Sequence, residues 1–147
     1  MDLHPDLMDV LAAFSSSDVD YLVVGGWAVS VHSEPRFTKD LDLLIGSAPE
    51  NLERAARALS LFGAPDSIVA QALALGPNEF LFFGVPPARI DLLRSIPGVS
   101  FDDAFRRRLD VRWGATLVHI ISKPDLIAAK RAAGREKDLR DLRVLER

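Results

Sequence analysis

The sequence predicts an α/β (α+β) fold in which a mixed, twisted sheet is flanked by helices. Short β-prone runs alternate with amphipathic helical segments along the chain. Of the 147 residues, 48% are hydrophobic, which is enough for a sizeable core. No linker, internal repeat or low-complexity segment divides the sequence. We therefore expect a single domain over residues 1–147.

The composition excludes several classes of protein. Charged residues of both signs make up 27% of the chain, which argues against disorder, and the absence of cysteine excludes disulfides and thiolate metal sites. No apolar run approaches the roughly 20 residues of a membrane span, and the first residues do not read as a signal peptide. The net charge of -3 argues against wrapping duplex nucleic acid. We expect a cytoplasmic protein with no membrane partner.

The first third of the chain predicts a helix, a strand, a glycine turn and a second helix. Apolar residues recur at helical spacing between Asp6 and Phe14, and Tyr21-Leu22-Val23-Val24 is a compact β-prone run. This run leads into Gly25-Gly26, after which residues 27–32 can form a helix. Trp27 is expected to pack beside the glycine turn, with stacking on a base as the alternative.

The middle of the chain predicts a strand over Thr38–Ile45, then a helix that begins at Pro49. Alanine and leucine favour a further short helix within Ala64–Leu75. Two strand-like runs then follow, Phe80–Phe83 and Ile90–Leu93, separated by a proline-rich turn. These two runs predict a hairpin.

The last third predicts a helical turn, a hairpin and closing helices. The helical turn covers Phe101–Phe105, and the hairpin joins Leu109–Trp113 to Thr116–Ile121. Ser122 is placed to cap a following helix, and Gly134 predicts either a break or two consecutive helices over Asp125–Leu145.

Two acidic residues carry the main chemical signal. Asp40 and Asp42 alternate with Leu41 and Leu43, so in a strand the carboxylates project together, about 7 Å apart, while the leucines enter the core. Two carboxylates on one rigid face suit Mg²⁺, which is usually held by one or two carboxylates plus substrate phosphates. Asp91 lies between apolar neighbours in the same manner. The alternative is an exposed strand face whose carboxylates are only solvated.

The order of the glycine pair, the Asp40-Leu41-Asp42 strand and the later Asp91 resembles the signature of the nucleotidyltransferase superfamily that includes polymerase beta. The resemblance covers residues 21–93. It implies that Asp40, Asp42 and Asp91 are catalytic and hold two Mg²⁺ ions, with Mn²⁺ as an alternative. It also implies that Gly25 and Gly26 open a helix against the triphosphate of an NTP such as ATP.

General chemistry supports these roles. Glycine lets backbone amides approach a ligand closely, and a helix N-terminus favours anions such as phosphate. Arg36 precedes the acidic strand and is a candidate phosphate ligand, with a solvated loop residue as the alternative. The chain has neither a P-loop nor the spaced glycines of a dinucleotide-binding turn.

The C-terminal stretch from Lys123 to Leu145 is similar to the closing helices of minimal bacterial nucleotidyltransferases related to abortive-infection toxins. That resemblance nominates Lys130 and Asp138 as nucleotide-binding residues. The alternative is an amphipathic helix whose charges pair in water.

The predicted reaction is transfer of a nucleoside monophosphate from an NTP to an acceptor hydroxyl or phosphate, with release of pyrophosphate. The resemblance is consistent with a small molecule such as an antibiotic, a tRNA end or a protein side chain as acceptor. At this length a homodimer, or a partner protein, is expected to complete the cleft. The rival hypothesis is a non-catalytic partner of nucleotidyltransferase fold in a toxin and antitoxin pair.

Overall fold

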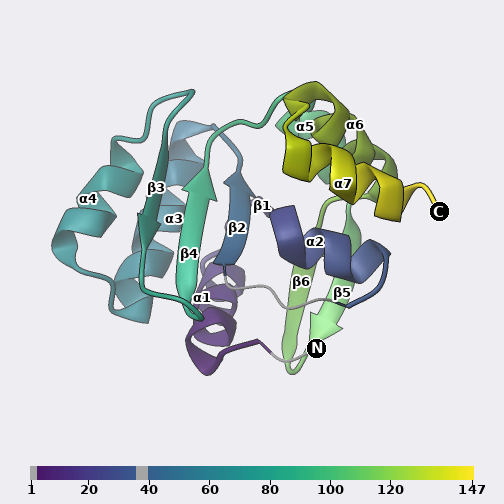
Figure 1. The fold of residues 1–147 in the computed structure, drawn as a ribbon. Helices are drawn as coiled ribbons and strands as arrows, with labels where there is room; N and C mark the ends of the chain where they lie inside the picture. Colours follow the sequence, from purple (N-terminus) through teal and green to yellow (C-terminus); the bar gives the residue numbers. More distant parts are fainter. Residues whose placement is uncertain (1–2, 36–39) are drawn as a thin grey trace.

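The protein folds into one mixed sheet with helices on both faces (Figure 1). The computed structural model describes residues 3–35 and 40–147. The strands described are β1 (Tyr21–Val24), β2 (Asp40–Ile45), β3 (Phe80–Phe83), β4 (Arg89–Leu93), β5 (Leu109–Trp113) and β6 (Thr116–Ile120). The helices described are α1 (Pro5–Ser16), α2 (Gly25–His32), α3 (Pro49–Phe62), α4 (Asp66–Leu73), α5 (Phe101–Arg106), α6 (Lys123–Ala133) and α7 (Glu136–Leu145).

The described strands form one sheet in the order β3-β4-β2-β1-β6-β5. The β2–β4 and β1–β6 pairs are parallel, and the other neighbouring pairs are antiparallel. The sheet is therefore mixed, with β2 and β1 at its centre and β3 and β5 at its edges. The predicted fold class is confirmed.

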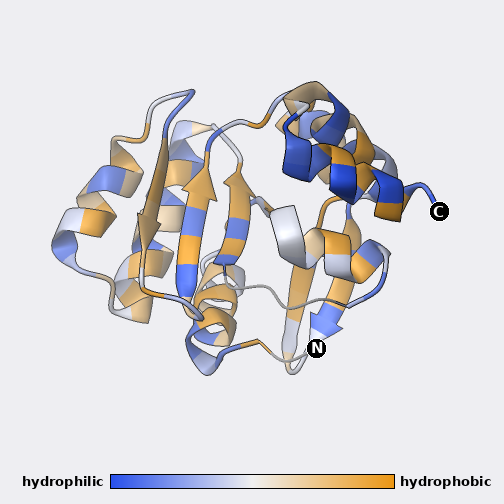
Figure 2. Ribbon diagram, viewed as in Figure 1, coloured by the Kyte–Doolittle hydropathy of each residue, from blue (hydrophilic) through white to orange (hydrophobic). Residues whose placement is uncertain are grey.

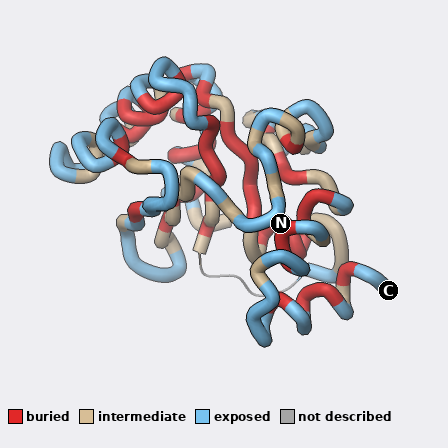
Figure 3. Tube along the Cα trace, turned by 90° about the horizontal axis from the view of Figure 1, so that it is seen from above, coloured by how far each residue is buried: buried red, intermediate tan, exposed pale blue. Residues whose placement is uncertain are grey.

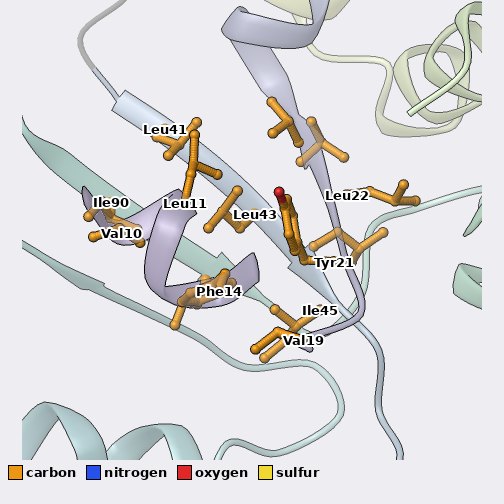
Figure 4. Packing of buried hydrophobic residues seen from close by; sticks show 14 of the residues in the cluster. Val10, Leu11, Phe14, Val19, Tyr21, Leu22, Leu41, Leu43, Ile45 and Ile90 are labelled. Atoms are coloured by element: carbon orange, nitrogen blue, oxygen red, sulfur yellow. The ribbon is translucent and has the colours of Figure 1, made fainter. Parts of the chain in front are cut away.

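The two faces of the sheet have different coverings. α1 and α3 cover one face, where Leu41, Leu43 and Ile90 pack against Leu11 and Phe14 of α1 (Figure 4). α2, α6 and α7 lie over the other face on the side of β1 and β6 (Figure 1). Figure 3 shows the buried residues, in red, concentrated in the central strands and on the inward sides of the helices. The β3 and β4 end of this second face has no helix over it in Figure 1.

The predicted elements are present with small shifts at their ends. The helix expected within residues 64–75 is α4, and both expected hairpins are the antiparallel pairs β3–β4 and β5–β6. α2 begins at Gly25, so the glycine pair forms its first two residues instead of preceding it. The predicted start of the second strand at Thr38, together with Arg36 and Lys39, lies outside the described residues.

The closing segment is two helices that meet at Gly134. Gly134 has φ +64°, in the left-handed region that glycine adopts without a Cβ penalty, and it caps the end of α6. Ser122 caps the start of α6, because its hydroxyl accepts a hydrogen bond from the Asp125 amide at 3.2 Å. The two-helix alternative predicted for residues 125–145 is therefore confirmed. No helix in the described part of the chain combines the length and apolar character that a membrane span requires.

Candidate active site

Three carboxylates stand side by side on the partly open face of the sheet. In the parallel β2–β4 pair Asp42 lies opposite Asp91, and Asp40 is two residues before Asp42 on the same strand. Residues paired across a sheet share a face, as do alternate residues along a strand. Asp40, Asp42 and Asp91, which we call the acid row, therefore project from one face. The intervening Leu41 and Leu43 are fully buried on the other face.

The acid row holds more negative charge than its surroundings compensate. Burial raises the pKa of Asp42, the charges of Asp91 and Asp40 raise it as well, and Lys137 acts in the opposite direction, so that together they move this pKa from 3.8 to about 7. A hydrogen bond between the Asp42 and Asp91 carboxyl groups adds to the shift. A bound cation would stabilise the ionised form of Asp42, which burial and its acidic neighbours disfavour.

Asp91 has a cation of its own. Arg89 Nε donates a hydrogen bond to Asp91 Oδ1 at 2.9 Å, and the guanidinium lies 4.2 Å from the centroid of the Phe82 ring. Alternation along β4 places Arg89 and Asp91 on the same face. One end of the acid row is thus held by a cation of the protein itself.

The glycine pair lies against the other side of Asp42. Gly25 has φ +67°, and a Cβ at this position would overlap the Asp42 carboxylate. Residue 25 is therefore restricted to glycine both by its backbone conformation and by the close approach of Asp42. Val24, the residue before α2, makes no side-chain cap, and a helix start of this kind presents N–H groups that favour an anionic ligand.

A cleft of about 450 Å³ lies between the sheet and the α6–α7 hairpin. Its volume is in the range of small-molecule sites. From the sheet and its loops it is lined by Val24, Gly25, Gly26, Asp40, Asp42, Leu93, Ile96 and Pro97. From the hairpin it is lined by Leu126, Ala129, Lys130, Ala133, Arg135, Lys137 and Asp138. Asp91 is beside Asp42 but is not part of this lining.

The wall of the cleft that faces the acid row is a buried ion cluster. Lys130 Nζ lies 3.3 Å from Asp138 Oδ1 and 3.0 Å from Asp141 Oδ2. Arg135 Nε donates to Asp138 Oδ2 at 2.7 Å, and the Arg135 amide donates to the same oxygen at 3.2 Å. Burial raises the pKa of Asp138, but the hydrogen bonds from Arg135 and the charge of Lys130 outweigh it, so the net shift is downward.

This cluster bears on the two sequence interpretations of the closing helices. Asp138 has 0% exposed surface, so the alternative in which its charge pairs in water is wrong. Lys130 and Asp138 both line the cleft, as their nomination requires, although they also bind each other.

The donor set of the acid row fits a hard cation, but not as a ready three-ligand site. Over residues 3–35 and 40–147, no group of three or more His, Asp or Glu side chains is arranged to hold a metal ion. The carboxylate oxygens are the right chemistry for Mg²⁺ or Mn²⁺, and the raised pKa of Asp42 reflects negative charge that a cation would stabilise. Asp40 and Asp42 reach the cleft directly, whereas Asp91 is held by Arg89.

Sequence reasoning brought together the acid row and the glycine pair but missed three residues. Arg135 and Lys137 line the cleft, and their position depends on how the α6–α7 hairpin packs, which no local pattern reveals. Arg89 could have been found, because it is two residues from Asp91 on one strand. Trp27 is buried, with its ring 6.1 Å from that of Trp113, as the packing interpretation predicted.

Comparisons with known proteins identify a family for this chain and a solved structure of similar fold. A family described as "Nucleotidyltransferase of unknown function (DUF6036)" matches residues 6–145. No curated protein matches the chain. Among solved structures, an antigenic nucleotidyltransferase-like protein from Paracoccidioides brasiliensis is similar, with a TM-score of 0.53 and 17% identity over 98% of this chain and 76% of that one. At this identity the likeness supports the fold alone.

Proposed function

Because the chain belongs to this family of nucleotidyltransferases, we propose that it transfers a nucleoside monophosphate from an NTP to an acceptor hydroxyl or phosphate and releases pyrophosphate. The predicted membership of the nucleotidyltransferase superfamily is confirmed. The observation that carries the proposal is the position of Asp40 and Asp42 at one wall of a cleft whose opposite wall is cationic. We infer that residues 1–147 act as a single nucleotidyltransferase-like domain.

The cleft offers complementary groups for each part of a nucleotide triphosphate. The N–H groups at the start of α2, beside Gly25 and Gly26, favour phosphate oxygens. Arg135 and Lys137 are exposed on the facing wall, and a guanidinium or ammonium there would neutralise the polyphosphate. Lys130 and Asp138 lie deeper in the same wall and would contact the nucleotide. Arg36, which precedes β2, is a further candidate phosphate ligand.

Asp40, Asp42 and Asp91 would hold the divalent metal ions. When bound, two such ions neutralise the charge that develops on the attacking and leaving oxygens of an in-line phosphoryl displacement. The two ions and their Mg²⁺ identity are part of the proposal. The contribution of the chain is to keep these carboxylates on one rigid face, where burial and its acidic neighbours disfavour the ionised form of Asp42 until a cation binds.

Asp91 lies on the side of the acid row away from the cleft, which is the side from which an acceptor would approach. We assign it the proton of the attacking hydroxyl. Arg89 holds one oxygen of this carboxylate, and the Asp91 carboxyl group also hydrogen-bonds to Asp42, so its place in the acid row is fixed from both sides.

Nucleotide binding is the first test. ATP, GTP, CTP and UTP are added separately with Mg²⁺ and the melting temperature is measured. A ligand that binds only the folded protein must raise this temperature. We expect at least one NTP to raise it in the wild type. If none does, the non-catalytic partner hypothesis gains and the proposal fails.

Catalysis is tested with an NTP labelled at the α-phosphate. Asp42→Asn should abolish transfer of label to any acceptor while leaving the fold intact. The matched control is Asp102→Asn, an exposed carboxylate in the first turn of α5 that lies outside the cleft lining. Undiminished labelling by Asp42→Asn would refute the role of the acid row.

A further inference from the structure

Two exposed phenylalanines stand on the same face of the sheet as the acid row. Phe80 is 57% exposed and Phe82 is 53% exposed, although both belong to a strand. In the antiparallel β3–β4 pair Phe82 lies opposite Asp91 and Phe80 lies opposite Leu93. Directly paired residues project from the same face, so both rings stand beside the candidate active site.

The exposure of these rings is not explained by the core. Leu81, between them, is 4% exposed and points to the face covered by α3 and α4. Phe83 points to the same face, and the centroids of the Phe83 and Phe62 rings are 6.2 Å apart. Burying a phenylalanine side chain stabilises a fold, and Phe80 and Phe82 lose about half of that contribution by remaining exposed. Figure 2 shows β3 as an apolar strand at the edge of the sheet, with no helix in front of it.

A cation completes this surface. The guanidinium of Arg89 lies 4.2 Å from the centroid of the Phe82 ring while it binds Asp91. Phe80, Phe82 and Arg89 together form what we call the aromatic shelf. The shelf is continuous with the cleft, because Leu93, opposite Phe80, is part of the cleft lining.

We propose that the aromatic shelf binds the acceptor, and that the acceptor is the 3′ end of a single-stranded nucleic acid. This inference rests on the proposed function. Phe80 and Phe82 are two residues apart on a strand, about 7 Å, so that each ring can take one base. Bases stack on aromatic side chains and on arginine guanidinium planes whatever their identity. A terminal base on Phe82 keeps its own 3′-hydroxyl beside Asp91.

In the proposed reaction the nucleoside monophosphate is transferred to this 3′-hydroxyl. The 3′-hydroxyl oxygen forms a bond to the α-phosphorus of the NTP in the cleft. The bond from this phosphorus to the oxygen that bridges to the β-phosphate breaks, and pyrophosphate leaves with the electron pair. Asp91 accepts the hydroxyl proton.

The geometry favours a nucleic acid end over a peptide. A peptide added to the free edge of β3 would lie about 10 Å from β4, because neighbouring strands are about 4.8 Å apart. A base on Phe82 is one strand away from Asp91. The net charge of -3 argues against a long footprint, which would need many basic contacts to phosphate, so the proposal is limited to one or two terminal nucleotides.

The test measures binding of a 5′-fluorescein hexa-adenylate RNA with a free 3′-hydroxyl by fluorescence anisotropy, with Mg²⁺ present. The matching DNA oligomer and an RNA duplex are measured alongside it. Phe82→Ala should weaken binding of the single strand by about five- to a hundredfold, and Phe80→Ala should weaken it less. The control is Leu117→Ala, which removes an apolar side chain that is 41% exposed on β6, and it should leave the affinity unchanged.

Two results would overturn the inference. One is equal affinity in the wild type, Phe82→Ala and Leu117→Ala, and the other is an absence of single-strand binding or a preference for the duplex. NTP-induced stabilisation is measured on the same samples. Loss of oligomer binding with intact NTP stabilisation removes the aromatic shelf but keeps the proposed function. Binding that depends on Phe82 without any NTP response keeps the shelf and removes the enzyme.

Discussion

The acid row and the ion cluster of the α6–α7 hairpin face each other across one cleft, yet they treat buried carboxylates in opposite ways. In the hairpin, Lys130 and Arg135 surround Asp138, and the pKa of Asp138 is lowered. On the sheet, burial and then the charges of Asp91 and Asp40 raise the pKa of Asp42 to about 7. The hairpin therefore pairs its buried carboxylate with cations of the chain, whereas the sheet leaves the charge of Asp42 to be neutralised by a bound cation.

The largest expected loss of stability comes from removing a cation from the ion cluster of the α6–α7 hairpin. Lys130→Met keeps much of the side-chain volume but leaves Asp138 and Asp141 buried without this cation. Removing one partner of a buried ion pair destabilises a protein by about 3–5 kcal/mol. Urea unfolding should show a loss of this size. Arg131→Met, which removes an exposed partner of Glu146 on the same helix, should change the unfolding free energy by less than about 0.5 kcal/mol. Similar losses in the two variants would mean that the cluster is not a structural unit.

The next prediction concerns the backbone that supports the acid row. Gly25→Ala adds a Cβ that overlaps Asp42, in a residue with φ +67°. Gly63→Ala is the matched control, because Gly63 has φ +97° and no atom within 4 Å of the added Cβ. The left-handed conformation costs a non-glycine residue about 1–2 kcal/mol, and overpacking adds roughly 1–3 kcal/mol. Gly25→Ala should therefore lose more stability than Gly63→Ala in urea unfolding, and only Gly25→Ala should lose NTP binding.

A double variant sharpens this result. If Gly25→Ala loses more stability than Gly63→Ala because the added Cβ overlaps the Asp42 carboxylate, then adding Asp42→Gly to Gly25→Ala should restore part of the unfolding free energy. An unchanged loss in the double variant would place the strain elsewhere around residue 25.

The acid row was more predictable than the cluster, for a physical reason. Alternation along a strand fixes which side chains share a face, so Asp40 and Asp42 could be grouped from the sequence, whereas Asp91, on another strand, was joined to them by the family resemblance. Phe80 and Phe82 also alternate along a strand and so share a face, and both are exposed because β3 is at the edge of the sheet. The parallel alignment of β2 with β4 depends on the whole topology and could not be predicted locally.

The cluster depends on packing between helices. Lys130 is on α6 and Asp138 on α7, and the turn at Gly134 determines whether they meet. Their nomination came from the family resemblance, and the amphipathic pattern alone favoured solvent exposure. The contribution of Arg135 and Lys137 to the cleft was missed for the same reason.

A smaller effect should appear in the pH dependence of the acid row. Because the pKa of Asp42 is about 7 in the folded protein and 3.8 is its ordinary value, the folded state binds more protons between these values. The unfolding free energy that depends on Asp42 therefore falls as pH rises from about 4 to above 7. Asp42→Asn should be more stable than the wild type at pH 8 by about 1–3 kcal/mol, with little difference at pH 4. Urea unfolding at both pH values measures this difference.

Magnesium provides the control for this interpretation. Mg²⁺ at pH 8 should stabilise the wild type and leave Asp42→Asn nearly unchanged, because a cation would supply the charge that the chain does not. Equal stabilisation of both proteins would locate the cation away from Asp42.

The smallest effect on stability is expected at Asp125, a carboxylate outside the cleft whose negative charge is paired with Arg107. Its pH dependence should be opposite to that of Asp42. Arg107 donates to both oxygens of Asp125, at 3.1 and 2.8 Å, and Ser122 donates at 2.8 Å. The hydrogen bond from Arg107 lowers the pKa of Asp125 despite its partial burial, with Ser122 adding to the shift. The stability that Asp125 contributes is present above its unfolded pKa and is lost as pH falls through the folded value. Asp125→Asn should lower the melting temperature by no more than a few degrees at pH 7, because Arg107 is largely exposed, and by less at pH 3. If instead the Asp125→Asn deficit grew as the pH fell, charge compensation would not be what separates these carboxylates from the acid row.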